Sequence, residues 1–373
     1  MSVFRSVIRQ VAILAIGTGT PLLGQANDYR VLVVSESGDI ASWLRPTASG
    51  LTLDRAVPVG VMPSDIDGPH NVTVAPDGRS YYITIAHGTP FGSLWKMDVG
   101  TDSLLGRAQV ELFPTTIGLT PDGRFAFVAN SDFYGDHPRT NVVSVIYTPT
   151  MTKVTDLAAC DMPHGVKVNH RGTRVYVSCM HSDELLELDV ATLAVARRVK
   201  TGAAAMAGAT MATHGSGQSA AAGSCSPTFV SVSPDDQRLY VACNSGNTLQ
   251  LWDAVGLKKL REISVGKGAY NVEPSPDGRL VIVTNKKDQS VSLIDANSLN
   301  ELARIPTSKK IVHGVAYSPD SRFAYISCES IGSDPGAVDV IDLGSRKLIG
   351  SLAVPGQPTG ITIVATHSSN PRS

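Results

Sequence analysis

The sequence predicts an all-β fold made of one repeated four-stranded unit, and three observations support this prediction. The 373-residue chain contains 34 glycines and 22 prolines, which is typical of a protein with many turns. Short runs of β-branched and aromatic residues lie between these turns along the whole chain. A Pro-Asp-Gly turn, or a variant of it, begins at residues 76, 121, 170, 234, 276 and 319.

Each repeat divides into four strands. An apolar run such as 314–317 precedes the turn, and a β-rich run such as 240–242 (Tyr-Val-Ala) follows it. A third run ends in aspartate, as at 293–295, and a more polar fourth run follows, as at 259–264. The turns are 42 to 49 residues apart, except for one gap of 64 between the third and fourth. This pattern is typical of the blades of a β-propeller.

A seventh blade is divided between the two ends of the chain. Residues 358–363 match the innermost strand of a blade, and runs at 30–34, 40–43 and 51–57 supply the other three strands. Pairing the ends closes the ring and removes exposed strand edges. We therefore predict an all-β fold: a seven-bladed β-propeller of four-stranded blades, closed by pairing N-terminal and C-terminal strands.

Residues 1–26 have the features of a signal peptide. Arg5 and Arg9 precede an apolar run that begins at 11–16, and Gly24-Gln25-Ala26 is a small-x-small cleavage site. The apolar run is shorter than the ~20 residues of a membrane span, which favours cleavage over an anchor. We expect a periplasmic or secreted protein.

Residues 27–373 are expected to form a single domain, with a low-complexity insertion between blades at 201–224. No later stretch is apolar enough to cross a bilayer. The formal net charge is −1, without a long basic run, so no nucleic-acid partner is expected.

Three histidines occupy the same position in different blades. His70, His164 and His313 lie six residues before the turns of blades one, three and six, where the innermost strands begin. These positions are spread nearly three-fold around the channel, at the end that we call the top. Three converging imidazoles suit a transition metal with one open position. The alternative is a polar channel lining hydrogen-bonded to water, as expected for threonines at equivalent positions.

Other potential ligands gather at the same end. His87 and His181 lie eleven residues after the turn position of blades one and three, and His137 lies in a long blade-two loop. The insertion contains Met206, Met211 and His214, and thioether with imidazole favours copper, with zinc as the alternative. The insertion can equally be read as a low-complexity loop with incidental methionines.

The cysteines follow the same register. Cys179, Cys243 and Cys328 end the second strands of their blades, whereas Cys160 and Cys225 directly precede first strands. Because these two strands are antiparallel neighbours, we predict the disulfides Cys160–Cys179 and Cys225–Cys243, with Cys328 unpaired and buried.

The blade-three cysteines allow a second interpretation. With His164 and His181, Cys160 and Cys179 would form a Cys2His2 metal site within one blade. In an exported protein the disulfide is the better interpretation.

The repeat resembles a known family. Tyr-Val-Ala/Ser/Thr-Asn/Cys in the second strand, with Pro-Asp-Gly before it and Ile-Asp after it, resembles the bacterial YVTN β-propellers, and Val283-Thr284-Asn285 is the closest match. The resemblance covers nearly the whole mature chain. In kind, the histidine-lined channel is similar to the propeller domain of nitrous oxide reductase. The adjacent paired histidines and the second copper domain of that enzyme are missing here.

The sequence contains no nucleophile elbow, phosphate-binding glycine loop or Cys-x-x-Cys-His motif. We expect a histidine-ligated metal at the top of the channel and, if the protein is an enzyme, a metal-dependent oxidoreductase whose catalytic residues stay unassigned. The expected partner is a small molecule or a protein at the top face. The alternatives are a non-catalytic binding scaffold and a lactonase-like hydrolase.

Overall fold

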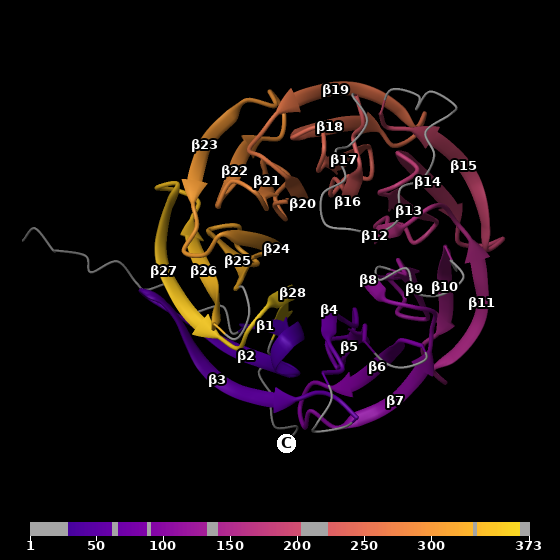
Figure 1. Ribbon diagram of the computed structural model, residues 1–373, viewed down its shortest axis with the longest axis horizontal. Coiled ribbons are helices and arrows are strands. Elements are labelled where there is room, and N and C mark those ends of the chain that lie inside the picture. Colours follow the sequence, from indigo (N-terminus) through magenta and orange to yellow (C-terminus); the bar gives the residue numbers. More distant parts are fainter. Residues whose placement is uncertain are drawn as a thin grey trace, which may run out of the picture.

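The computed structural model describes residues 29–61, 66–87, 91–132, 141–202, 223–330 and 334–365. These residues form seven four-stranded antiparallel sheets arranged as blades around a central axis (Figure 1). One short 3-10 helix, η1 (Glu36–Gly38), joins the first two strands. The predicted seven-bladed all-β architecture is confirmed.

Blades one to three run outward from the axis in chain order. Blade one contains β4 (Pro69–Val74), β5 (Ser80–Ile85), β6 (Ser93–Asp98) and β7 (Leu104–Gln109). Blade two contains β8 (Pro114–Leu119), β9 (Phe125–Asn130), β10 (Val142–Tyr147) and β11 (Thr152–Ala158). Blade three contains β12 (Pro163–Val168), β13 (Arg174–Cys179), β14 (Glu184–Asp189) and β15 (Ala194–Lys200).

Blades four to six repeat this order. Blade four contains β16 (Pro227–Val232), β17 (Arg238–Cys243), β18 (Thr248–Asp253) and β19 (Lys258–Ser264). Blade five contains β20 (Ala269–Pro274), β21 (Leu280–Asn285), β22 (Ser290–Asp295) and β23 (Glu301–Pro306). Blade six contains β24 (Ile311–Tyr317), β25 (Phe323–Glu329), β26 (Gly336–Asp342) and β27 (Lys347–Val354).

The seventh blade closes the ring as expected. Its innermost strand is β28 (Pro358–Ala365), and β1 (Tyr29–Ser35), β2 (Ile40–Thr47) and β3 (Gly50–Pro58) follow outward. β28 pairs antiparallel with β1, with Tyr29 opposite Ala365 and Val33 opposite Ile361. The N-terminal strands are thereby held between the last blade and the first.

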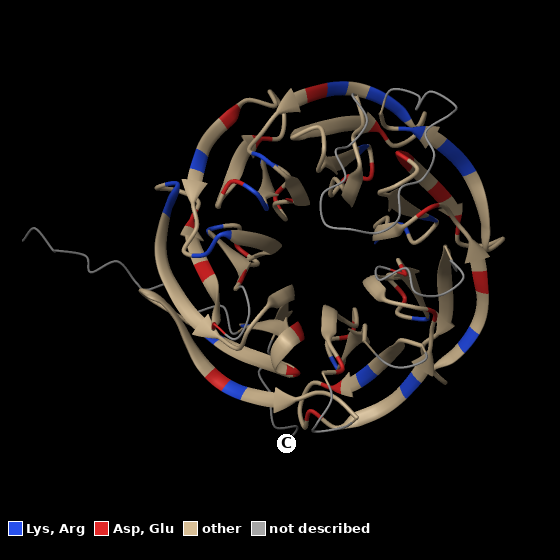
Figure 2. Ribbon diagram, in the orientation of Figure 1, with Lys and Arg blue, Asp and Glu red and all other residues tan. Residues whose placement is uncertain are grey.

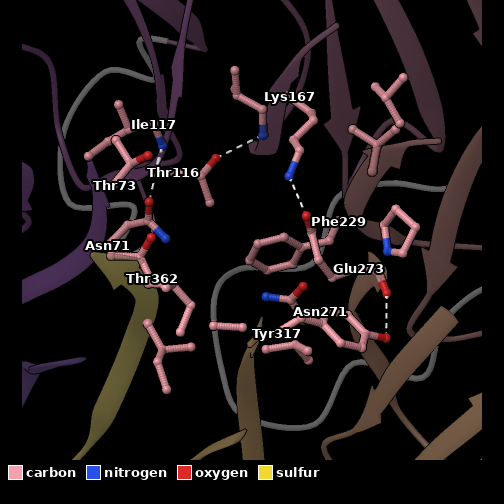
Figure 3. Close-up of a pocket in the computed structure, with 18 of the residues that line it drawn as sticks. Asn71, Thr73, Thr116, Ile117, Lys167, Phe229, Asn271, Glu273, Tyr317 and Thr362 are labelled. Atoms are coloured by element: carbon pink, nitrogen blue, oxygen red, sulfur yellow. Dashed lines mark hydrogen bonds and ion pairs between the residues drawn. The ribbon is translucent and has the colours of Figure 1, made fainter. Parts of the chain in front are cut away.

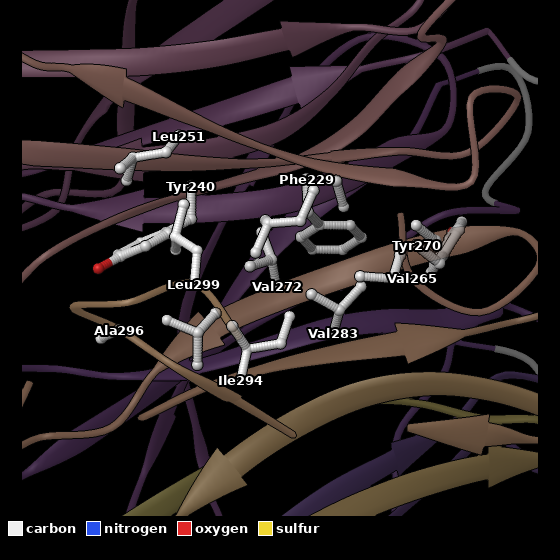
Figure 4. Packing of buried hydrophobic residues seen from close by; sticks show 14 residues of the cluster. Phe229, Tyr240, Leu251, Val265, Tyr270, Val272, Val283, Ile294, Ala296 and Leu299 are labelled. Carbon is white, nitrogen blue, oxygen red and sulfur yellow. The ribbon is translucent and has the colours of Figure 1, made fainter. Parts of the chain in front are cut away.

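Burial explains why the inner and outer strands differ in sequence. The middle strand β13 is buried at five of its six positions, whereas the outer strand β15 alternates between exposed and half-buried residues. A strand covered on both faces needs continuous apolar residues, and one covered on a single face needs every second residue to be apolar. Adjacent blades bury these residues against one another, as Phe229, Val272 and Val283 do between blades four and five (Figure 4).

Charged residues lie mostly on the outer strands and turns, where basic and acidic side chains are interspersed (Figure 2). On β15, Arg197 pairs with Glu187 and Arg198 with Glu184 of the neighbouring strand. No helix in the described ranges is long and apolar enough to cross a membrane. The expected signal peptide lies outside the described residues, as does residue range 203–222 of the insertion.

Both predicted disulfides are present. Cys160 bonds to Cys179 and Cys225 to Cys243, with Cα atoms 6.0 and 4.5 Å apart. Cys328 is buried and free. The disulfides therefore exclude the Cys2His2 interpretation of blade three, because both of its cysteine sulfurs are in a covalent bond with each other.

The aspartate that ends the third strand closes the next turn. Asp98, Asp189 and Asp295 each accept hydrogen bonds from two backbone N–H groups and one hydroxyl of the turn that follows. These hydrogen bonds lower the pKa of each carboxyl below its usual value of 3.8, and the backbone N–H of Ser345 does the same for Asp342. The repeated Asp thus has a local structural role.

These turns predict a loss of stability in acid. A carboxyl whose pKa is lowered by folding adds stability above its unfolded pKa of about 4, and that stability is lost as the pH falls further. A variant with Asp98, Asp189, Asp295 and Asp342 all changed to Asn should be less stable at pH 7. It should also lose less stability than wild type between pH 5 and pH 3, measured by urea unfolding. Equal losses in variant and wild type would contradict this role, and Asp334→Asn at an exposed position serves as control.

The contribution of the Cys225–Cys243 disulfide to stability can be tested with Cys328 as control, because Cys328 occupies the position of Cys243 in another blade. Replacing both residues by Ala should reduce the free energy of unfolding by about 3 kcal/mol. The bond closes the loop between Cys225 and Cys243 in the unfolded chain and so lowers its conformational entropy. Cys328→Ala removes an equally buried sulfur but no cross-link, and should cost about 1 kcal/mol. Similar costs for the two variants in denaturant titrations would show that the cross-link adds nothing.

Candidate functional site

The structure brings His70, His164 and His313 together at the top of the channel. They lie at the start of β4, β12 and β24 and are 6, 2 and 2% exposed. The His70 ring centroid is 5.5 Å from that of His313 and 6.5 Å from that of His164. Because a propeller directs the starts of its innermost strands at one axis, residues more than 240 positions apart in the chain meet here.

A buried carboxylate orients two of the histidines. Glu36, in η1 of the closing blade, is 4% exposed. One of its carboxylate oxygens lies 2.7 Å from His70 Nδ1 and the other 2.7 Å from His87 Nε2. Burial alone would raise the pKa of Glu36, but His70 and His87 lower this pKa to about 2. The carboxylate therefore stays ionised and accepts an N–H from each ring.

The Glu36 contact leaves one histidine nitrogen unused. Since His70 binds Glu36 through Nδ1, its Nε2 is the remaining nitrogen, and this atom is buried without a hydrogen-bond partner in the described part of the chain. A buried imidazole nitrogen without a partner is energetically costly. An imidazole whose other N–H is held by a carboxylate is also the usual arrangement for a histidine that ligates a metal.

Gly68 makes room for His87. Its φ of +66° lies in the left-handed region, and a Cβ at this position would be 1.6 Å from Cδ2 of the His87 ring. The Asp39 carboxylate accepts the Gly68 N–H at 2.9 Å and so fixes this segment. Glycine is therefore required both by the backbone conformation and by the ring that lies against it.

His164 is held as a neutral imidazole. Its Nδ1 donates to the Thr228 carbonyl at 3.0 Å, and its Nε2 accepts the hydroxyl of Tyr270 at 3.0 Å. Burial, followed by the nearby His70 and Lys286, lowers the pKa of His164 to about 3. Burial has the opposite effect on the Tyr270 phenol and raises its pKa to about 12, so the phenol keeps its proton. Both ring nitrogens of His164 are thus already in use.

His313 is buried among aromatic rings and charged side chains. Neither of its ring nitrogens has a hydrogen-bond partner within the described ranges, and Nε2 lies 3.8 Å from Glu329. Burial, followed by the neighbouring Lys286 and His70, holds the pKa of His313 well below its usual range. The ring is therefore neutral and can offer a lone pair.

A charged pair lies beside these rings. The Lys286 ammonium is 2.9 Å from Glu329 and 4.1 Å above the ring of Tyr270. Burial by itself would lower the pKa of Lys286, but Tyr270 and Glu329 raise it. The ammonium therefore stays protonated, in a favourable cation–π position over the aromatic ring.

Two phenylalanines pack against the histidines. Phe229 has its ring centroid 5.1 Å from that of His164 and 6.3 Å from that of His313, and Phe113 lies 5.3 Å from His70. All three contacts are edge-to-face, a preferred geometry of aromatic pairs. They surround the imidazoles with apolar surface and exclude water from them.

Of the remaining expected ligands, the structure describes only His181, and it lies outside this cluster. His181 lies at the edge of blade three, 40% exposed, with Nδ1 4.0 Å from Asp161. His137, His214, Met206 and Met211 lie outside the described residues. Within the described ranges, no three His, Cys, Asp or Glu side chains are grouped so as to hold a metal ion.

Sequence reasoning missed four residues of the cluster. Tyr270 occupies the same strand-opening position as the histidines, so the repeat register could have identified it. The register could also have identified Lys286 and Glu329, which lie ten residues after the turn prolines of blades five and six. Glu36 takes the same position after the second strand of the closing blade.

Comparisons with known proteins agree with this architecture. Residues 225–327 match the family model described as Cytochrome D1 heme domain, a range that includes Tyr270, Lys286 and His313. A solved structure of PpgL, a periplasmic gluconolactonase from Pseudomonas aeruginosa, is 20% identical with a TM-score of 0.69, covering 91% of this chain and 99% of that one. These likenesses establish the fold.

Two further structures are similar. Dihydro-heme d1 dehydrogenase NirN, solved in complex with DHE, is 17% identical with a TM-score of 0.56, covering 90% of this chain and 75% of that one. Hydrazine synthase from Kuenenia stuttgartiensis is 20% identical with a TM-score of 0.62, covering 80% of this chain and 90% of that one. At these identities no activity is carried over to this propeller.

The fit between Gly68 and His87 gives a direct test of the cluster. Gly68→Ala should lower the free energy of unfolding by about 2 kcal/mol or more, because the new Cβ overlaps the His87 ring and the left-handed backbone is strained for alanine. Gly344→Ala is the matched control, since a Cβ there has no contact closer than 3.4 Å. Equal unfolding midpoints for the two variants would argue against the packing described.

Proposed function

We propose that this propeller binds a redox-active, metal-centred tetrapyrrole at the top of its channel, where His70 would hold the metal. The observation that carries the proposal is the buried, unpartnered Nε2 of His70, whose other ring nitrogen is held by Glu36. A metal ion is the partner that such a nitrogen lacks. His313, also unpartnered, is the second candidate donor.

The number of available donors favours a tetrapyrrole over a bare copper ion. A copper or zinc ion bound only by protein needs three or four donors. The described cluster offers two free imidazoles, because His164 is bonded on both sides and His87 binds Glu36. Iron in a tetrapyrrole receives four ligands from the ring and needs one or two from the protein. The match to the Cytochrome D1 heme domain and the likeness to NirN support the same choice.

The residues of the chain have distinct roles in this proposal. Glu36 orients His70 and increases the basicity of the ligating nitrogen. Tyr270 keeps its proton and donates it to His164 as a hydrogen bond, so these two residues can hold a proton beside the cofactor. Lys286 adds a positive charge, and Phe113 and Phe229 exclude water. The bound group would supply one-electron chemistry.

An exported location is part of the same proposal. Two disulfides close loops in blades three and four, and such bonds persist in oxidising compartments. A periplasmic site would give the cofactor access to a small-molecule substrate or a redox protein at the top face. The resemblance to YVTN propellers stays a prediction alongside it.

The test is binding of haemin to the purified protein, followed by absorption spectroscopy and metal analysis. Wild type should bind one haemin per chain with a shifted Soret band. His70→Ala should weaken this binding at least tenfold, because the nitrogen that would hold the metal is lost, and His313→Ala should alter the spectrum. His181→Ala, at an exposed position, should leave both the haemin affinity and the absorption spectrum unchanged.

Three results would overturn the proposal. If haemin binds equally well to wild type and His70→Ala, then His70 is not its ligand. If protein from periplasmic expression contains one copper per chain and no tetrapyrrole, and His70→Ala loses that copper, the histidine site stands but the tetrapyrrole is wrong. Absence of any bound metal or haemin would favour a non-catalytic binding scaffold.

A further inference from the structure

A second site lies deeper in the channel, below the histidines. A cavity of about 570 Å³ is lined by the later parts of the innermost strands and by the Pro-Asp-Gly turns (Figure 3). Phe229 lines this lower cavity and also packs against His164, whereas His70, His164 and His313 do not line it. Phe229 therefore separates the two levels of the channel. The volume is within the range of small-molecule sites.

An ion pair crosses the lower cavity. Lys167 of blade three and Glu273 of blade five lie 2.6 Å apart, although blade four stands between them. Ser231 of blade four donates to the second oxygen of Glu273 at 2.8 Å. The two side chains are 34 and 30% exposed, so their polar atoms face the cavity (Figure 3). Together they make this region polar without giving it a net charge.

Two carboxamides in the lower cavity have unused hydrogen-bonding groups. Asn71 and Asn271 occupy the same position, one residue after the strand-opening residue, in blades one and five. The Asn71 oxygen accepts the Ile117 N–H at 3.3 Å, but its NH2 group donates to nothing in the described residues. The Asn271 side chain makes no hydrogen bond with that part of the chain. Both are placed to bind a ligand.

Aromatic and apolar surface completes the wall. Phe229 and Tyr317 line the cavity, and the Tyr317 hydroxyl is held by the Glu273 carbonyl at 3.2 Å. The aromatic rings offer flat faces, and valine and isoleucine side chains lie between the polar groups. A ligand that fits must therefore be polar at several points and carry C–H groups between them.

From this combination we propose that the lower cavity binds an uncharged polyhydroxylated molecule of monosaccharide size. A hydroxyl both donates and accepts, so it can satisfy Glu273, Lys167 and a carboxamide in turn. A charged ligand would meet like charge in one member of the ion pair, and an apolar one would leave the half-buried Asn71 and Asn271 amides without a partner. A polyol has neither disadvantage.

At the rim of the lower cavity, two turns carry a residue that differs from the Pro-Asp-Gly pattern. His170 stands where most turns have proline, and Asp236 stands at φ +59° where most have glycine. The Asp236 carboxylate accepts His170 Nδ1–H at 2.7 Å and the Arg171 N–H at 3.0 Å. This pairing fixes the imidazole at the lower edge of the cavity, where its Nε2 can bind a further hydroxyl.

The experiment is isothermal titration calorimetry of the full chain with glucose, ribose and mannitol. Gluconate, glucosamine and cyclohexanol are the anionic, cationic and apolar controls. At least one polyol should bind at millimolar concentration or below, more tightly than all three controls. Asn271→Ala should weaken this binding about five- to tenfold, the effect of one lost hydrogen bond. Asn297→Ala, in an exposed turn, should not change it.

A second variant tests the role of charge. Glu273→Gln keeps the shape of the side chain and leaves Lys167 unpaired, so preference should move from the polyol towards gluconate. No binding of any polyol, tighter binding of cyclohexanol, or equal effects of Asn271→Ala and Asn297→Ala would overturn the inference. His70→Ala should leave polyol binding unchanged, which separates this site from the haemin site.

Discussion

Pairing of β28 with β1 is the contact on which the rest of the molecule depends. It joins strands from opposite ends of the chain, closes the ring and removes the two edges that six blades alone would expose. It also has a local consequence. The turn after β1 carries Glu36, so ring closure is what brings this carboxylate to His70 and His87 in blade one. Fold and candidate site thus depend on the same contact.

The top of the channel contains charges that are matched within the protein. Glu36 is surrounded by two histidines, and Lys286 lies between Glu329 and the face of Tyr270. Buried charges without such partners would be strongly destabilising. The neutral His164 and His313 can then lie beside them without adding a charge. Among the described residues of the cluster, His70 Nε2 and both ring nitrogens of His313 remain without a hydrogen-bond partner.

The channel is divided into two chemical environments by one aromatic side chain. Above Phe229, imidazoles are packed among aromatic rings and largely hidden from water. Below it, an ion pair and two carboxamides face an open cavity. Because seven strands converge on the axis, a few side chains from different blades decide what each level can bind.

The repeat pattern was enough to predict seven blades, the split closing blade and both disulfides, because each depends on a register that recurs every 42 to 49 residues. The same register placed His70, His164 and His313 at one end of the channel. Tertiary structure alone decided which of their nitrogens are free. Glu36 comes from the turn after β1 in the closing blade, and the Tyr270 hydroxyl reaches His164 from two blades away. A linear pattern specifies where a strand begins, whereas hydrogen bonds across the axis depend on distances between blades.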